Sequence, residues 1–296
     1  MKEVNNRHPL TLTDLQQVTA LSSAAISADG RYLVYVTTRV DMDHNTYRDD
    51  INVVELSSGE LKRSWEGASP KWSPVANEIA YEAPHNGDEY IWICEIDSDV
   101  KRPLARIYES HYFMGHLCLK NFEWSPDGTK IAYVSAAAAP PAAAAVKVID
   151  RLLYKTKGGR GRPAVTDNEY SHIWAVSVKE GVIQPVTDGS YNEHSICWSP
   201  DGLQIAFVSN RSADPDNNQL HDLWSVTLST GHITRHTHHF GTVCQPVWSP
   251  NGAHIAFLGT TGQLSTNDSP AEDTQLYALA VADNTYQCLT RSLDRR

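Results

Sequence analysis

Cysteine is scarce in this sequence. Its 296 residues include five cysteines, an odd number, and none lies close to another along the chain. Cys94, Cys197 and Cys288 fall in segments with a strand pattern, where a reduced, buried thiol is the ordinary outcome. A reducing compartment is therefore expected, and we predict a cytoplasmic protein.

Long apolar runs and an excess of basic charge are absent as well. Residues 1–10 have no apolar stretch behind their charges, unlike a secretory signal. No apolar run approaches the roughly 20 residues that a membrane-spanning helix needs. Acidic side chains outnumber basic ones by 35 to 25, which disfavours nucleic acid or an anionic membrane as the principal partner.

A nucleophile motif of the α/β-hydrolase type is also absent. The nearest approach to Gly-x-Ser-x-Gly is Gly67-Ala-Ser69-Pro-Lys71, which lacks the second glycine and lies in a repeat turn. The paired acids Asp49-Asp50 and Asp214 with Asp216 lie in loops without calcium-binding spacing. We assign no catalytic residue to this chain and predict no cofactor.

Histidine is the one metal-ligating residue that clusters. His232, His236, His238 and His239 fall within eight residues, and neutral imidazoles can bind zinc or nickel. The alternative is a turn, an outer strand and an exposed loop. No acid or cysteine completes a ligand set, so we predict no metal site.

What the sequence does contain is one short motif, called the phrase below, that occurs five times. An apolar anchor is followed by a Ser-Pro-Asp-Gly turn or a variant of it, and by an aliphatic residue seven positions after the anchor. The copies begin at Ile26, Trp72, Trp124, Trp198 and Trp248. Proline presets φ, Asp or Asn bonds its own backbone, and glycine supplies a positive φ. A period near 50 residues indicates a repeat array.

Each copy leads into short strands. The segments after the turns, such as Ile131-Ala-Tyr-Val134 and Ile205-Ala-Phe-Val208, are apolar on both faces, so we expect both faces to be buried. A second strand follows, as in His172-Ile-Trp-Ala-Val-Ser-Val178, and then a Gly-bearing turn and a further short strand. Several short strands per unit, packed between neighbouring units, are typical of a β-propeller blade. The alternative is a β-sandwich with chance similarity, which five copies at fixed spacing disfavour.

The predicted fold is therefore all-β, a β-propeller of four-stranded blades with about five blades present. A short helix is predicted over residues 11–19, with Thr13 as its N-cap and Leu15 and Val18 on one face. Residues 1–21 form an N-terminal attachment segment and residues 22–296 the propeller. The repeats lie near 22–67, 68–119, 120–193, 194–243 and 244–292.

The anchors are separated by 46, 52, 74 and 50 residues. The long interval carries an insertion of roughly two dozen residues. It opens with the low-complexity tract Ala136–Ala145 (Ala and Pro), which cannot form a packed core. Lys155, Lys157, Arg160 and Arg162 then form the one basic cluster. Such charge runs are usually solvated; the alternative is that they bind an anionic group such as a peptide carboxylate.

The chain resembles the N-terminal propeller of the S9 prolyl oligopeptidase family, in particular its acylaminoacyl-peptidase and dipeptidyl-peptidase-like members. The likeness covers nearly the whole chain. The segments that carry it are Leu12-Thr-Asp-Leu15, Ser27-Ala-Asp-Gly-Arg-Tyr-Leu-Val-Tyr-Val36, Thr38-Arg-Val-Asp41, Tyr47-Arg-Asp-Asp50, Val148-Ile-Asp-Arg-Leu-Leu-Tyr-Lys-Thr156 and His172-Ile-Trp174. The Trp-Ser-Pro-Asp-Gly phrase is less specific, since TolB-like propellers share it.

The resemblance implies a propeller of about seven blades that caps a catalytic α/β-hydrolase domain, restricts access to it and helps position oligopeptides. The sequence stops at Arg296, after the fifth repeat. We therefore expect an incomplete product without the hydrolase domain and inactive by itself; a closed five-bladed propeller is the alternative. The resemblance makes Arg151, Lys155 and Arg160 candidates for substrate contacts.

Two functions remain open from the sequence, beside a third reading in which the chain is a gene fragment with no activity of its own. The first is the substrate-gating propeller of a cytoplasmic S9-type serine peptidase that acts on short peptides. The second is a TolB-like propeller that binds proteins and carries no enzyme. The expected partner of a gating propeller is an oligopeptide substrate, which binds through the missing hydrolase domain. A homo-oligomer is compatible with both functions.

Overall fold

The computed structural model describes residues 11, 14, 17–108, 122–138, 170–215, 218, 220–238, 240–260 and 274–293. The chain divides into two compact units, residues 1–103 and 104–296, and each is described by itself. Among the described residues there are twenty strands, arranged in five sheets.

The first two sheets follow each other along the chain. The first contains β1 (Ala20–Ile26), β2 (Tyr32–Asp41), β3 (Thr46–Glu55) and β4 (Leu61–Glu66). The second contains β5 (Ala68–Trp72), β6 (Glu78–His85), β7 (Asp88–Glu95) and β8 (Lys101–Ile107). In both sheets the spatial order of the strands is their order in sequence.

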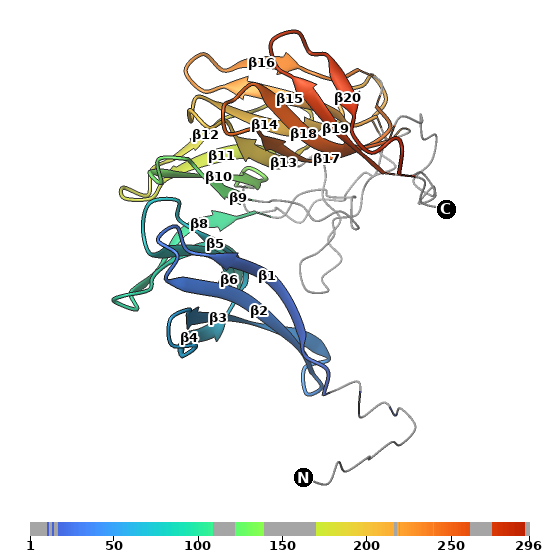
Figure 1. Ribbon diagram of the computed structural model, residues 1–296. Coiled ribbons are helices and arrows are strands. Elements are labelled where there is room, and N and C mark those ends of the chain that lie inside the picture. The colour runs from blue at the N-terminus through green and yellow to red at the C-terminus, as the bar shows by residue number, and fades with distance from the viewer. Residues whose placement is uncertain are drawn as a thin grey trace, which may run out of the picture. The chain divides into compact units, whose positions relative to one another are not determined.

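The second unit contains the other three sheets, which lie face to face in Figure 1. The third sheet contains β9 (Phe122–Trp124), β10 (Lys130–Ser135), β11 (His172–Ser177) and β12 (Ile183–Pro185). The fourth contains β13 (Glu193–Trp198), β14 (Gln204–Ser209), β15 (Asp222–Thr227) and β16 (His232–Arg235). The fifth contains β17 (Val243–Trp248), β18 (His254–Gly259), β19 (Gln275–Ala280) and β20 (Tyr286–Cys288).

Each sheet is thus a blade of four strands that are consecutive in sequence. The five four-stranded blades predicted from the repeat are confirmed, and the fold is that of a β-propeller. Within a unit, the first strands of neighbouring blades contact each other: β1 contacts β5, and β13 contacts both β9 and β17. The first strands therefore lie at the edge where neighbouring blades converge.

The repeated phrase forms the turn between the first and second strands of a blade. In the fourth blade the Ser199 hydroxyl donates to Asp201 Oδ1 at 2.5 Å and accepts from the Gln204 amide at 2.9 Å. Gly202 has a φ of +70°, in the left-handed region. The Ser199 hydroxyl, and then the Leu203 amide, lower the pKa of the Asp201 carboxyl. The same serine bonds recur at Ser27, Ser125 and Ser249.

The anchor tryptophan joins its blade to the preceding one. Trp72 Nε1 donates to the carbonyl of Ala25, and Trp198 Nε1 to the carbonyl of Glu123, both at 3.1 Å. Each acceptor is the residue directly before the anchor of the preceding blade. Trp248 is an exception: its Nε1 is buried and has no hydrogen-bond partner among the described residues.

This exception gives a matched pair of substitutions. We expect Trp198→Phe to lower the free energy of unfolding by about 1 kcal/mol more than Trp248→Phe, because the first removes a hydrogen bond and the second does not. Both replace an indole by a phenyl ring, so the lost volume largely cancels. Urea unfolding followed by circular dichroism measures the difference, and equal losses would contradict the assigned role of the indole nitrogen.

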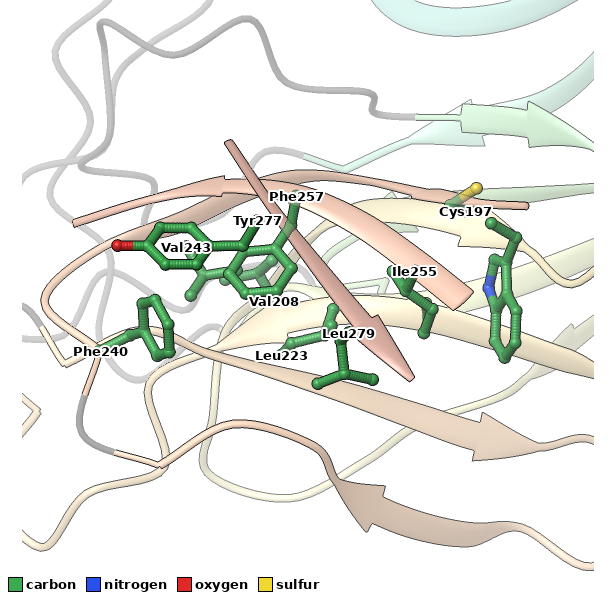
Figure 2. Packing of buried hydrophobic residues seen from close by; sticks show 11 residues of the cluster. Cys197, Val208, Leu223, Phe240, Val243, Ile255, Phe257, Tyr277 and Leu279 are labelled. Carbon is green, nitrogen blue, oxygen red and sulfur yellow. The ribbon is translucent and has the colours of Figure 1, made fainter. Parts of the chain in front are cut away.

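Apolar side chains fill the space between the fourth and fifth blades, as Figure 2 shows. We call the face of a blade that carries its anchor the near face and the opposite face the far face. The fourth blade presents its far face to the near face of the fifth. Phe240 packs edge-on against Phe257 and Tyr277, with ring centroids 5.4 and 5.1 Å apart. The cluster contains Cys197, Ala206, Val208, Leu223, Phe240, Val243, Trp248, Ile255, Phe257, Tyr277 and Leu279.

The helix predicted over residues 11–19 is not found, since the described residues contain no helix element. Thr13 and Leu15 lie outside the described residues. The Asp14 carboxylate accepts hydrogen bonds from the Thr11 amide and hydroxyl at 2.8 and 2.7 Å, an arrangement of the capping-box type that is compatible with the start of a helix. Val18 is 58% exposed, so it lacks the packing that sustains a short helix.

Two further expectations bear on the cysteines and on membranes. Cys94, Cys197 and Cys244 are buried and Cys288 is half-buried, and Cys94 and Cys288 are free thiols. Burial raises the pKa of the Cys94 thiol to about 11. Among the described residues no helix has the length and apolarity needed to cross a membrane.

Candidate functional site

A left-handed residue interrupts the first strand in four of the five blades. Ser23, Ser69, Ser195 and Gln245 have φ between +51° and +54°, and each lies three positions before the anchor. The pairing register shifts around each one, which defines a β-bulge. The corresponding position of the third blade, 121, lies outside the described residues. Bulges are over-represented beside functional sites, where they redirect side chains.

Beside the bulge of the fourth blade lies a fully buried carboxylate, that of Glu193 at the start of β13. Its Oε1 accepts from Arg211 Nη2 at 2.7 Å. Its Oε2 accepts from His172 Nδ1 at 2.9 Å and from the Thr187 hydroxyl at 3.1 Å. His172 and Thr187 come from the third blade, so this carboxylate fastens the third blade to the fourth.

The Arg211 guanidinium is enclosed by aromatic rings. Its central carbon lies 4.9 Å from the centroid of Tyr191, 5.1 Å from that of Trp224 and 5.4 Å from that of Phe207. The side chain is 11% exposed, and its Nε is buried without a hydrogen-bond partner. Rings around a desolvated cation stabilise it through cation–π attraction. The arginine is therefore held rigidly, with Glu193 as its counter-ion.

Two histidines form a second part of the cluster. His194 Nδ1 lies 3.0 Å from the Ser195 hydroxyl, and His194 Nε2 lies 3.1 Å from His221 Nδ1. Burial, and then the neighbouring His221, lower the pKa of His194 well below its usual value. Burial lowers the pKa of His221 to about 4. Both imidazoles are therefore neutral at pH 7, and each can donate one hydrogen bond and accept one.

The serine in this row cannot act as a nucleophile on a substrate. Ser195 is 1% exposed, so no peptide carbonyl can reach its hydroxyl in this arrangement. Among the described residues no group of three or more His, Cys, Asp and Glu side chains is placed to hold a metal ion. What the contacts of Glu193 do show is a cluster that holds the third and fourth blades together.

The histidine cluster of the sequence is divided by the fold. His232 is exposed at the start of β16, and His239 lies outside the described residues. His236 is buried, with Nδ1 2.7 Å from Asn284 Oδ1 and Nε2 2.8 Å from the Ser225 hydroxyl. Burial lowers the pKa of His236. Its two ring nitrogens are both occupied, and they link the fourth blade to the fifth.

The three residues predicted to contact substrate, Arg151, Lys155 and Arg160, lie outside the described residues. The Glu193 cluster was not predicted. A signal for it exists: Glu193 occupies the position that is Gly67 in the second blade and Val243 in the fifth, counted back from the anchor. A charged residue where other copies have a small or apolar one indicates a special environment.

Comparison with known proteins gives the following relatives. No family model matches the sequence. The uncharacterized peptidase YuxL of Bacillus subtilis is 24% identical over 231 residues, which are 72% of this chain and 33% of that protein. The chain thus spans about a third of the length of this curated relative.

Solved structures give the same fold. An acylaminoacyl peptidase of Pyrococcus horikoshii matches with a TM-score of 0.65 and 16% identity, over 95% of this chain and 41% of that one. The β-propeller domain of the trilobed protease of Pyrococcus furiosus matches with a TM-score of 0.57 and 15% identity, over 94% and 72%. TolB of Acinetobacter baumannii matches with a TM-score of 0.54 and 18% identity, over 90% and 53%. The chain therefore resembles S9-type peptidase propellers, and shares their fold with TolB.

Proposed function

We propose that this chain, which resembles the propellers of S9-type peptidases, is the substrate-gating part of a serine peptidase that acts on short peptides. A ring of packed blades leaves a narrow axial passage, so that only short or unfolded peptides pass. The catalytic groups would come from an α/β-hydrolase domain outside these residues. A cytoplasmic location belongs to the proposal, and the free thiols of Cys94 and Cys288 support it.

The observation that carries the proposal is the extent of the match to a peptidase. Almost all of this chain, 95%, corresponds to 41% of the acylaminoacyl peptidase, and the curated relative is also a peptidase. The cluster around Glu193 supports a gating role, because it fixes the start of the first strand β13 of the fourth blade to His172 and Thr187 of the third blade. Arg151, Lys155 and Arg160 remain proposed contacts for an anionic group of the peptide, which arginine recognises bidentately.

The coding sequence that follows residue 296 tests this proposal. Further repeats and then a Gly-x-Ser-x-Gly motif would support the peptidase. An immediate stop would contradict it and favour the second candidate, a protein-binding propeller without an enzyme. The likeness to TolB over 90% of this chain supports that candidate.

Labelling with a serine-directed phosphonate tests whether the catalytic serine lies in this chain or in another domain. We expect no labelling of the present chain, because Ser195, which lies beside an imidazole, is 1% exposed and no nucleophile elbow is present. Intact-mass spectrometry after incubation measures the adduct, with a known serine peptidase as the control. Stoichiometric labelling at any serine of this chain would overturn the assignment of catalysis to another domain.

A further inference from the structure

The sequence contains two Asn-Gly dipeptides, and the fold places both in tight turns. Asn86-Gly87 joins β6 to β7, and Asn251-Gly252 belongs to the repeated phrase between β17 and β18. An asparagine before glycine is prone to deamidation: the glycine nitrogen attacks the side-chain amide carbon, and glycine has no side chain to hinder the attack. The two turns hold their asparagines differently, and this difference decides which of them reacts.

The turn at Asn251 holds both reacting groups in place. Asn251 Oδ1 accepts hydrogen bonds from the Ser249 hydroxyl at 2.8 Å and from the Ala253 amide at 3.1 Å. The attacking nitrogen, that of Gly252, donates to the Ser249 carbonyl at 2.9 Å. Attack requires these bonds to break first, because the amide carbon must turn toward the glycine nitrogen. This set of bonds, which we call the serine clamp, therefore protects the dipeptide.

The turn at Asn86 has no such clamp. Asn86 and Gly87 have positive φ, +53° and +88°, and the pairing of His85 with Asp88 closes a two-residue hairpin turn of type I′. Both turn residues are exposed. Within the described part of the chain, the Gly87 amide donates no backbone hydrogen bond, and the Asn86 side chain makes one hydrogen bond, from Nδ2 to His85 Nε2 at 3.3 Å. The nucleophile and the amide carbon can therefore approach each other without first losing a clamp.

His85 lies next to the group that leaves. Its ring packs edge-on against Tyr90 and Trp92, with ring centroids 5.2 and 5.3 Å apart, so the imidazole is held beside the Asn86 amide nitrogen. Once Gly87 has attacked, that nitrogen becomes an amine with a basic lone pair. A protonated imidazole at this distance can donate its proton to the amine, which then departs as ammonia.

We propose that Asn86 is a site of spontaneous deamidation, assisted by His85, and that the serine clamp protects Asn251 from the same reaction. A bond forms between the Gly87 nitrogen and Asn86 Cγ, and the Gly87 amide proton passes to water. The bond from Cγ to Nδ2 breaks, and ammonia leaves with the proton that His85 supplies and then regains from solvent. The product is a cyclic succinimide. Water opens either of its two carbonyl groups and gives aspartate or isoaspartate, with no oxidant or reductant.

The isoaspartate form should disturb the end of the hairpin between β6 and β7. It adds one methylene group to the main chain, whereas a two-residue turn fixes the register of the strands that it joins. The new acid also adds a negative charge beside Asp88 and Glu89. The modification therefore accumulates with the age of the chain at this hairpin and leaves the repeated turn at Asn251 intact.

Ageing the full 296-residue chain in neutral buffer, followed by peptide mapping with mass spectrometry, tests the proposal. We expect Asn86 to be converted faster than Asn251 by about tenfold or more, because the reaction at Asn251 must first break the hydrogen bonds of the clamp. In concentrated urea both turns are unfolded, and the two rates should become similar. Equal rates in the folded chain, or a difference that persists in urea, would contradict the protection by the clamp.

Two variants test the roles of His85 and Ser249 separately. His85→Gln keeps a hydrogen-bonding side chain that cannot transfer a proton, so the rate at Asn86 should fall several-fold and the rate at Asn251 should stay the same. Ser249→Ala opens the clamp and should raise the rate at Asn251 alone. Ser199→Ala is the matched control, since it removes the same hydroxyl from the turn of the fourth blade and should change neither rate. An unchanged rate at Asn86 in the first variant, or at Asn251 in the second, would overturn the proposal.

Discussion

Glu193→Ala is expected to lower the free energy of unfolding by about 3–5 kcal/mol. The substitution removes the carboxylate that accepts from Arg211, His172 and Thr187, and it leaves the guanidinium without its counter-ion among aromatic rings. An uncompensated buried charge is costly because it loses hydration without gaining a partner. Since a domain is stable by only about 5–15 kcal/mol, urea unfolding should show a large shift of the midpoint.

Two further variants show whether the loss of stability in Glu193→Ala comes from the unpaired buried charge of Arg211. Lys62→Ala breaks the surface pairs of Lys62 with Glu55 and Glu60 and should cost at most about 1 kcal/mol. The double variant Glu193→Leu with Arg211→Met removes both charges, and it should regain much of the stability lost in Glu193→Ala. If Glu193→Ala stays within 1 kcal/mol of the wild type, the carboxylate does not fasten the third and fourth blades.

The second large effect is a loss of stability in mild acid. The folded chain holds the pKa of His221 at about 4 and that of His194 well below 6.5, chiefly by burial, and burial also lowers the pKa of His236. Below pH 6.5 the unfolded chain binds protons that the folded chain does not, so stability is complete above that pH and falls as the pH drops toward 4. For His221 alone the loss amounts to about 3 kcal/mol.

The measurement is the free energy of unfolding at intervals between pH 7.5 and 4.5. His221→Asn should flatten this profile, because it removes one buried group that must stay neutral. Asp201→Asn serves as the control: the lowered pKa of Asp201 contributes stability that is lost only as the pH falls below its usual value of 3.8. The slope above pH 4.5 should therefore match the wild type in the control, and a flat wild-type profile would refute the buried neutral pair.

The blades could be predicted from sequence because their chemistry is local. Ser199, Asp201 and Gly202 form a turn from contacts within six residues. The repeated sequence therefore predicts the same turn wherever it occurs. The centres of the strands after it, such as Ile131–Val134 and Ile205–Val208, are apolar on both faces, as expected for strands packed between blades. The repeated turn and the strand segments that follow it therefore predicted five four-stranded blades.

The candidate site could not be predicted in the same way, because its contacts cross between blades. Glu193 meets His172 and Arg211 only after strands 21 and 18 residues away are in place. The bulge at Ser195 could not be predicted from a glycine, because the residue with positive φ is serine or glutamine in each described copy. The predicted helix over residues 11–19 is not supported by packing either, since Val18 on its expected apolar face is 58% exposed.

The construction of each blade from four consecutive strands also bears on how such a gene can change. No described sheet borrows a strand from a distant part of the chain, so one continuous stretch of codons, about 50 in most repeats and 74 where the insertion lies, encodes a complete blade. Recombination between two anchor regions would add or delete a blade in a single in-frame event, and the flanking blades would keep every strand pairing. Blade number is thus a trait that can change in whole steps over evolutionary time.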